Sequence, residues 1–453
     1  MMADLRKDSA PISQESGEPA ANRGKPPATR LDSYRWYVVG MLWLVCFFSY
    51  ADRQAFFSVF PLLTKDLGLT TIELGLLGSS FAVVYGIGGP FAGMVVDRIR
   101  RKTAILGGLQ LWSGVCMASA ASRNFVQLLL FRATEGLGET IYYPAALSMV
   151  SDYHGSRTRS RAMGALQTSV YAGTVGGGYW AGALAQQYGW RSALLLFGGL
   201  GSILGFVLIG LLREPIRGMA DGHDSSSPMA PAPTSRAVTL TGIRSILTIR
   251  SLLALMSAFA CANFVAMVLL AWMPMYLYSR FHLSLAAAAF DAAVYPQVAS
   301  IAGSFLGGYL ADSWAKRTAR GRVLVQCAGV AAAAPFVALC GLGRSLPAVI
   351  VALLCWGFLK GIYDSNIFAA AFDVVPAGHR GVVSGSMNCV GWLLGAGTAP
   401  VLIGYLAEHI PLGSAIALSS VVYWVAAILL IVTMACFLED DIRSLRARHS
   451  GVI

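Results

Sequence analysis

Seven ionisable residues are concentrated in three apolar stretches of this sequence, and they are the residues whose types could do chemistry. They are Asp52, Arg53, Arg132, Glu135, Glu139, Lys360 and Asp364. An ionisable side chain in the interior of a bilayer costs at least about 2.5–3.5 kcal/mol on insertion scales, so each needs a partner or a function. Buried carboxylates can take up protons, and arginine matches a carboxylate or phosphate in two-point contact. These residues therefore predict anion binding linked to proton movement.

The charges of the first half are spaced so that they meet. Arg132, Glu135 and Glu139 stand at i, i+3 and i+7, which places them on one face of a helix. The two predicted spans run in opposite directions across the membrane. Counting about 1.5 Å per residue from their ends places Asp52 and Arg53 at the same membrane depth as Arg132 and Glu135, and places Glu139 near the midplane of the membrane. We expect the two arginines to compete for the same carboxylates.

The charges of the second half stand at positions related to these by a repeat. Lys360 and Asp364 are one helical turn apart, with Tyr363 and Asn366 beside them. When the two halves are aligned, the segment EGLGE, which ends at Glu139, corresponds to KGIYD, which begins at Lys360. The acidic Glu135 of the first half then corresponds to the basic Lys360 of the second. The alternative for any single pair is a structural salt bridge, but the repeat-related positions favour a functional role.

Aromatic and amide side chains near the charges could supply stacking and hydrogen bonds to a ligand. They are Tyr50, Tyr142, Tyr143, Trp272, Tyr276, Tyr363, Asn263 and Asn366. Taken singly, each fits a packing or interfacial role better than a ligand contact.

The elements that must position these residues are membrane-spanning helices. Of the 453 residues, 56% are hydrophobic and 13% are charged, which excludes an ordinary soluble protein. Apolar runs of about 20 residues, the length of one helical crossing, recur along the chain. The twelve predicted spans are 36–60, 74–96, 103–120, 125–150, 162–186, 192–212, 252–278, 285–311, 323–342, 346–372, 382–407 and 414–438.

The net charge of +11 encodes membrane topology and does not indicate a nucleic-acid site. Most of the 34 Lys and Arg residues fall in alternate loops, as the positive-inside rule predicts when both termini are cytoplasmic. Only five fall on the other side: Lys65, Arg123, Arg191, Arg280 and Arg344. We expect no cleaved signal peptide, and we expect a multi-pass protein of a plasma membrane, in particular a bacterial inner membrane.

The predicted fold class is an all-α membrane protein with two pseudo-symmetric six-helix bundles. The predicted units are a disordered N-terminus (1–35), the first bundle (36–212), a Pro-rich cytoplasmic linker (213–250), the second bundle (251–438) and a tail (439–453). All eight cysteines fall in spans without a C-x-x-C pair, and no Walker motif, haem motif, zinc spacing or nucleophile elbow appears. We expect no cofactor, no metal and no enzyme activity.

A repeated loop marks corresponding points of the two halves. GMVVDRIRRK follows the second span, and GYLAD followed by KR comes after the eighth. Its Asp can pair with basic residues or cap a helix, and its Arg residues can hold the loop against helix ends. We expect a conformational latch that stabilises an outward-open state, formed by Gly93, Asp97, Arg98, Arg101 and Asp312. Positive-inside topology alone is the alternative explanation of the basic residues.

The loop Gly-x-x-x-Asp-Arg-x-x-Arg-Lys resembles the signature loop of the major facilitator superfamily. With twelve spans and a central linker, the resemblance covers roughly Arg35 to Glu439 and implies a cavity lined by spans one, four, seven and ten. Tyr-Ala-Asp52-Arg53 and Gly-Leu-Gly-Glu139 resemble the anion:cation symporter branch and the Spinster-like transporters. The stretch YYPAA that begins at Tyr142 is more similar to the symporter branch.

These observations together predict a secondary active transporter that moves a small organic anion, of sugar-acid or carboxylate type, by alternating access and with proton coupling. The alternatives are a Spinster-like carrier of a lysolipid or other amphiphile, and a receptor that binds without transport. We assign proton coupling to Asp52, Glu135 and Glu139. Substrate binding is assigned to Arg53, Arg132, Lys360, Asp364, Tyr50, Tyr142, Tyr363 and Asn366. The expected partners are an anionic small molecule, protons and the lipid bilayer, for a chain that acts as a monomer.

Overall fold

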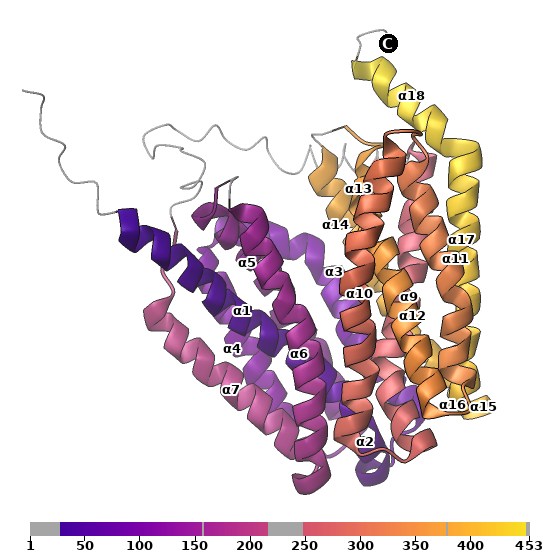
Figure 1. Cartoon of the computed structure of the whole chain (residues 1–453). Helices are drawn as coiled ribbons and strands as arrows, with labels where there is room; N and C mark the ends of the chain where they lie inside the picture. The colour runs from indigo at the N-terminus through magenta and orange to yellow at the C-terminus, as the bar shows by residue number, and fades with distance from the viewer. Residues whose placement is uncertain (1–27, 156–157, 216–247, 377–378, 450–453) are drawn as a thin grey trace, which may run out of the picture.

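The computed structural model describes residues 28–155, 158–215, 248–376 and 379–449, and within these ranges every regular element is a helix (Figure 1). The helices of the first half are α1 (Ala28–Ser58), α2 (Phe60–Leu67), α3 (Thr71–Arg98), α4 (Arg101–Ser119), α5 (Phe125–Tyr153), α6 (Arg159–Tyr188) and α7 (Trp190–Leu211). Those of the second half are α9 (Arg250–Phe281), α10 (Leu285–Ala315), α11 (Gly321–Leu342), α12 (Leu346–Asp364), α13 (Ile367–Phe372), α14 (Arg380–Val390), η3 (Gly391–Ala396), α15 (Ala399–His409), α16 (Leu412–Leu418), α17 (Ser420–Val432), η4 (Thr433–Phe437) and α18 (Leu438–His449).

The described helices are long and apolar enough for a membrane protein. Eight helices or continuous helical runs meet the length and composition needed to cross a bilayer. All twelve predicted spans fall on helices; the four outside those eight are α1, α4, α5 and α6, of which α1 and α5 carry the buried charges. The all-helical membrane fold is thus confirmed, while the count of twelve crossings and the side of the termini stay predictions.

Three stretches differ in detail from the predicted segments. Helix α1 begins at Ala28, within the segment predicted to be disordered, and its Tyr34 hydroxyl donates to the carbonyl of Leu211 at 2.8 Å. The tenth span breaks between α12 and α13, and the eleventh contains the π-helix η3. Residues 1–27 and 216–247, to which the N-terminal and linker predictions refer, lie outside the described residues.

The C-terminal stretch, predicted only as a tail, forms helix α18 and is attached to the second half. Arg320 Nε lies 2.8 Å from a carboxylate oxygen of Glu439, and Asp441 accepts hydrogen bonds from the backbone N–H and hydroxyl of Ser251 at 2.9 and 2.5 Å. Asp441 therefore satisfies a free donor near the start of α9, where a negative charge is also favourable.

The two halves touch mainly at the end of the molecule that is remote from α18, which we call the far end. There the Thr71 hydroxyl donates to the carbonyl of Gly404 at 2.8 Å, and the Gln186 side chain accepts from the backbone N–H of Leu285 at 3.1 Å. Gly404 is required at this crossing because a Cβ there would collide with the Thr71 carbonyl oxygen. Figure 1 shows the two groups of helices diverging from the far end toward α18.

Candidate functional site

A buried ion pair joins α1 to α5. Arg53 Nε donates to Glu139 Oε2 at 2.6 Å, and its Nη2 contacts the same oxygen. The hydroxyl of Ser49, one turn earlier on α1, donates to that carboxylate at 2.8 Å. Glu139 therefore accepts from three donors, and Arg53 is held with its charge compensated inside the first half.

A second ion pair lies within α5. Arg132 Nη1 contacts Glu135, which also accepts from the hydroxyl of Ser119 at 3.4 Å. The Arg132 guanidinium lies over the rings of Phe56 and Phe81, at 4.4 and 4.8 Å from their centroids. The structure thus brings all five predicted charges of the first half together, but each arginine has its own glutamate.

Asp52 is the fifth charged residue of this cluster and belongs to neither of these two ion pairs. Its side chain is buried, with the residue 3% exposed, and it accepts a weak hydrogen bond from Cys116 Sγ at 3.7 Å. Its second carboxylate oxygen, Oδ2, has no hydrogen-bond partner among the described residues. Three carboxylates therefore face two guanidinium groups in this cluster. A buried carboxylate without a partner is costly when ionised, and a bound proton removes that cost.

Four aromatic rings surround the guanidinium of Arg53. The rings of Tyr50, Phe81, Tyr85 and Trp392 have centroids at 4.7, 4.7, 5.0 and 5.3 Å from Arg53 Cζ, within the range of cation–π attraction. Trp392 comes from η3 of the second half and packs on Tyr85 of α3 at 4.7 Å between centroids. We call these four rings the aromatic cage; it links the charge cluster directly to the second half.

Of the four rings of the cage, Tyr50 is a residue predicted from the sequence, and the other three were not predicted. Phe81 and Tyr85 stand at i, i+4 in the second predicted span, and this spacing on one helix face was an available signal. No such signal existed for Trp392, because its place opposite Arg53 follows from the packing of one half on the other.

The second-half charges also pair as their spacing predicts. Lys360 Nζ contacts Asp364 Oδ2 one turn along α12, and their side chains remain 24% and 35% exposed. Tyr363 and Asn366 are buried instead, and the Asn366 amide donates to the carbonyl of Gly307 at 3.2 Å. Lys360 and Asp364 are therefore accessible, whereas the polar groups beside them hold α12 and its continuation against α10.

Tyr142 has a packing role in this conformation. Its buried hydroxyl donates to the carbonyl of Leu42 at 3.0 Å, and its ring meets Trp112 edge-on at 5.4 Å between centroids. Two other candidates are used similarly: Trp272 Nε1 donates to the carbonyl of Pro400 and the Tyr276 hydroxyl to that of Gly341.

Glycines of α5 and α6 set the positions of the charged helices. A Cβ on Gly136, between the two glutamates of α5, would lie 2.8 Å from the carbonyl oxygen of Phe81 in α3. A Cβ on Gly177 of α6 would collide with the backbone of Ala51, next to Asp52. Small residues let helices approach closely, so the EGLGE segment combines two ion-pairing groups with a tight crossing.

The predicted latch region contains ion pairs that remain within each half. Arg101 at the start of α4 pairs with Asp152 near the end of α5. In the second half, Arg322 lies 3.4 Å from Asp312 and 2.7 Å from Asp373. Corresponding helix ends thus carry corresponding pairs. The latch itself stays a prediction, because the surroundings of Gly93 and the side chain of Asp97 lie outside what the structure describes, and Arg98 is exposed.

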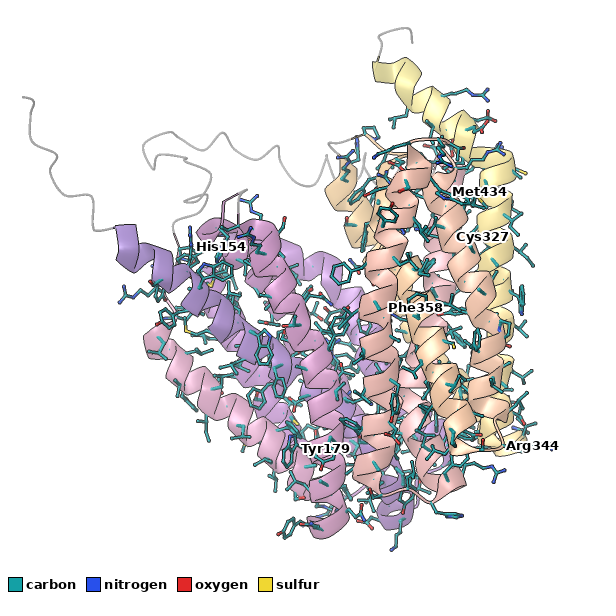
Figure 2. All side chains as sticks on the ribbon, viewed as in Figure 1. His154, Tyr179, Cys327, Arg344, Phe358 and Met434 are labelled. Carbon is teal, nitrogen blue, oxygen red and sulfur yellow. The ribbon has the colours of Figure 1, made fainter. Side chains whose placement is uncertain are left out.

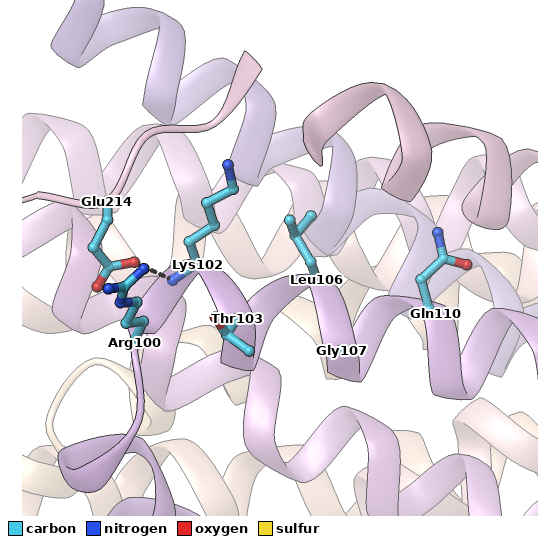
Figure 3. A pocket seen from close by; sticks show the side chains of 7 residues that line it. All are labelled: Arg100, Lys102, Thr103, Leu106, Gly107, Gln110 and Glu214. Atoms are coloured by element: carbon cyan, nitrogen blue, oxygen red, sulfur yellow. Dashed lines mark hydrogen bonds between the residues drawn. The ribbon is translucent and has the colours of Figure 1, made fainter. Parts of the chain in front are cut away.

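Glu214 completes the contacts at the start of α4. Its carboxylate accepts from the backbone N–H groups of Arg101 and Lys102 at 2.8 and 2.7 Å, in a pocket that Arg100 also lines (Figure 3). A carboxylate at a helix N-terminus satisfies free donors and interacts favourably with the helix dipole. The beginning of the linker is thereby fastened to the first half.

The sequence model of the Major Facilitator Superfamily matches residues 42–400 of the chain, which contain the whole charge cluster and most of each half. The chain belongs to the Major Facilitator Superfamily. It is therefore a multi-pass membrane transporter of a small molecule and not an enzyme.

Relatives within the superfamily include two kinds of transporter. The chain is 27% identical to the "Probable galactarate/D-glucarate transporter" of Bacillus subtilis (strain 168), over 84% of this chain and 87% of that one. It is 25% identical to the hexuronate transporter of the same organism, over 82% and 88%. It is 26% identical to Protein spinster of Drosophila melanogaster, over 85% of this chain and 65% of that protein.

The fold is also similar to a solved transporter. A bacterial homolog of the human lysosomal transporter Spinster, crystallised in an inward-facing and unoccupied conformation, superposes with a TM-score of 0.78 at 21% identity and covers 92% of this chain and 99% of that one. This likeness confirms the superfamily fold.

Proposed function

We propose that the protein is a proton-coupled carrier of a small organic anion, of the sugar-acid or carboxylate type. The observation that carries this proposal is the buried Arg53–Glu139 pair inside its aromatic cage, next to the unpartnered carboxylate of Asp52. Relatives whose names refer to galactarate, glucarate and hexuronate support an acidic sugar as the substrate class.

Arg53 is the group suited to the anion. Its guanidinium is bound by one carboxylate, that of Glu139, and a substrate carboxylate can take the same place in two-point contact. Binding there requires Glu139 to leave, and a buried glutamate that has lost its cation is costly when ionised. Proton uptake by Glu139 therefore accompanies anion binding in this mechanism.

Asp52 supplies a second position for the proton. With three carboxylates and two guanidinium groups, one proton brings the cluster to neutrality, and Asp52 is the carboxylate with the fewest donors around it. We assign Asp52 to hold that proton in the conformation described here and Glu139 to exchange one when the anion binds Arg53. Glu135, which is paired with Arg132, is the third carboxylate that we assign to proton coupling.

The second half contributes a further positive charge, that of Lys360, and a contact that couples anion binding to the movement of the two halves. Lys360 can turn from Asp364 toward a second carboxylate of the substrate, as its partly exposed side chain permits. Trp392 of the second half contacts the Arg53 guanidinium and the Tyr85 ring, so a change in the position of Arg53 alters a contact between the two halves. In alternating access, the halves rock about the bound anion, so a residue that touches the site from the other half couples binding to rocking.

A carrier of a lysolipid or other amphiphile is the second candidate. One observation favours it: an apolar groove of about 370 Å³ runs beside Leu310, Trp314, Ala328, Leu359 and Ile362, between α10, α11 and α12. Leu359 is the neighbour of Lys360 in α12. An acyl chain in this groove would lie along the helix that carries the second-half charges.

We further propose twelve crossings with both termini cytoplasmic, location in a bacterial inner membrane, and function as a monomer. The placement of the basic residues supports the topology, and the bacterial relatives support the membrane.

The experiment that tests the substrate class is uptake into proteoliposomes under an inward proton gradient, with galactarate, glucarate, a hexuronate, neutral sugars and a lysolipid. We expect uptake of the acids alone, lost in Arg53→Ala and retained in Lys65→Gln, which removes an exposed positive charge far from the cluster. Uptake of the lysolipid alone, unaffected by Arg53→Ala, would refute the anion proposal in favour of the amphiphile.

A further inference from the structure

A pocket at the far end of the second half is lined by two arginines, on a side of the protein that has few other basic residues. It has a volume of about 640 Å³ and lies between the end of α9, the α11–α12 turn and the start of α16. Among its lining residues are Tyr276, Ser279, Arg280 and Arg344. Two of the five Lys and Arg residues predicted for this side of the membrane therefore face one pocket.

No acidic side chain compensates these arginines. The pocket lining contains no Asp or Glu, and among the described residues no ion pair joins Arg280 or Arg344 to an acid. Arg280 lies near the ring of its neighbour Phe281, with 5.9 Å between Cζ and the centroid. Two exposed guanidinium groups in one concave site repel each other, and an anion between them removes that repulsion.

The floor of the pocket is built by close backbone contact. A Cβ on Gly341 would collide with the carbonyl oxygen of Gly413, and the reverse also holds. The hydroxyl of Tyr276 donates to the Gly341 carbonyl at 2.8 Å and closes the floor from α9. The pocket is thus a fixed feature of three packed helix ends and does not depend on one flexible loop.

The position of the pocket selects a membrane lipid as its occupant. Arg280 stands one residue before the end of α9, and Arg344 lies in the turn before α12, so both are at the depth of lipid headgroups. Arg344 lies at the outer edge of the second half in Figure 2, away from the first half. Leu342, which lines the same pocket, is 60% exposed on the adjacent apolar flank, where an acyl chain would lie.

We propose that this pocket binds the phosphate headgroup of an anionic phospholipid in the leaflet at the far end. The guanidinium groups of Arg280 and Arg344 clamp the phosphate, since the donor geometry of arginine matches phosphate oxygens. The acyl chains follow Leu342 along the outside of α11. The lipid fastens the ends of α9, α11 and α16 together at the end where the halves meet.

The test measures lipid retained on the purified full-length protein by native mass spectrometry, with phosphatidylglycerol titrated against phosphatidylcholine. Each arginine contributes roughly 1 kcal/mol toward an anionic headgroup, which corresponds to about fivefold in apparent Kd. We expect Arg280→Gln with Arg344→Gln to weaken phosphatidylglycerol binding by about 25-fold, as two such contributions together. The matched control, Lys65→Gln with Arg123→Gln, removes two positive charges from the same side outside the pocket and should have no effect.

Three results would overturn the proposal. They are equal loss in the control variant, binding of phosphatidylcholine as tight as that of phosphatidylglycerol, and full displacement of the lipid by glycerol 3-phosphate at similar concentration, which would assign the pocket to a soluble anion. If the double variant does not fold, the single variants Arg280→Gln and Arg344→Gln serve instead, each with an expected loss of about fivefold. None of these results depends on the transport substrate.

Discussion

Replacing two buried carboxylates by their amides, Asp52→Asn and Glu139→Gln, should change stability by very different amounts. Both residues are buried in the same cluster, and each substitution replaces a carboxyl group with an amide of nearly the same shape. The difference lies in the partners: Glu139 compensates Arg53, whereas Asp52 Oδ2 has no hydrogen-bond partner in the part of the chain that the structure describes.

The magnitudes follow from these contacts. Glu139→Gln leaves Arg53 with a buried charge and no counter-ion in the pair, and breaking a buried ion pair costs about 3–5 kcal/mol. The Gln amide oxygen still accepts a hydrogen bond and the aromatic cage remains, so we expect the lower end, about 3 kcal/mol. Asp52 holds a proton in this account, so Asp52→Asn replaces a neutral acid with a neutral amide, and we expect a change of about 1 kcal/mol or less.

Thermal unfolding of the purified protein in detergent measures this contrast. At roughly 2 °C per kcal/mol for a chain of this size, Glu139→Gln should lower Tm by about 6 °C and Asp52→Asn by about 2 °C at most. An excess of the transported anion should recover part of the loss in Glu139→Gln, because the anion compensates Arg53. Equal losses in the two variants would refute the assignment of Glu139 as the partner of Arg53 and of Asp52 as the unpartnered acid.

Three further predictions concern the surroundings of the cluster. Trp392→Ala should lower the transport rate several-fold while Trp392→Phe retains most of it, because the cage then keeps a second-half ring over Arg53; equal rates in the two variants would contradict the coupling role. Gly177→Ala should destabilise the protein by about 1–3 kcal/mol in thermal unfolding, and Gly176→Ala should not, since only the Cβ at Gly177 collides with the α1 backbone. Burial lowers the pKa of His154 below its usual value, so the folded state disfavours its protonation; stability should fall as pH decreases below about 6.5, and His154→Gln should weaken that dependence in unfolding scans at pH 7.5 and 5.5.

The sequence predicted the charge cluster well because helical spacing and depth are local properties. The i, i+3, i+7 spacing on α5 placed the glutamates on one face, and counting residues brought Arg53 to their depth. The one-turn spacing of Lys360 and Asp364 predicted their contact in the same way. Which arginine pairs with which glutamate depends on side-chain packing between helices, and the structure was needed to separate the two pairs.

Other features of the site depend on contacts between segments that are distant in the chain. Trp392 reaches Arg53 only because η3 packs on α3, and a π-helix gives no periodic signal that would have placed it. Tyr142 and Asn366 were predicted to contact the substrate because of their neighbours in the sequence, yet their polar groups donate hydrogen bonds to backbone carbonyls. Helix α18 was missed for a related reason, since its attachment depends on Arg320 and Ser251 far along the chain.

The measurement that tests the central claim most directly is proton movement recorded during anion transport. Proteoliposomes that contain a pH-sensitive dye are given galactarate outside at equal pH on both sides and with the membrane potential clamped, and the internal pH is followed. The account predicts that the wild-type protein acidifies the lumen as the anion enters, while Glu139→Gln exchanges labelled for unlabelled anion without proton movement. Anion entry at the wild-type rate with no change of internal pH, or unchanged proton movement in Glu139→Gln, would contradict it.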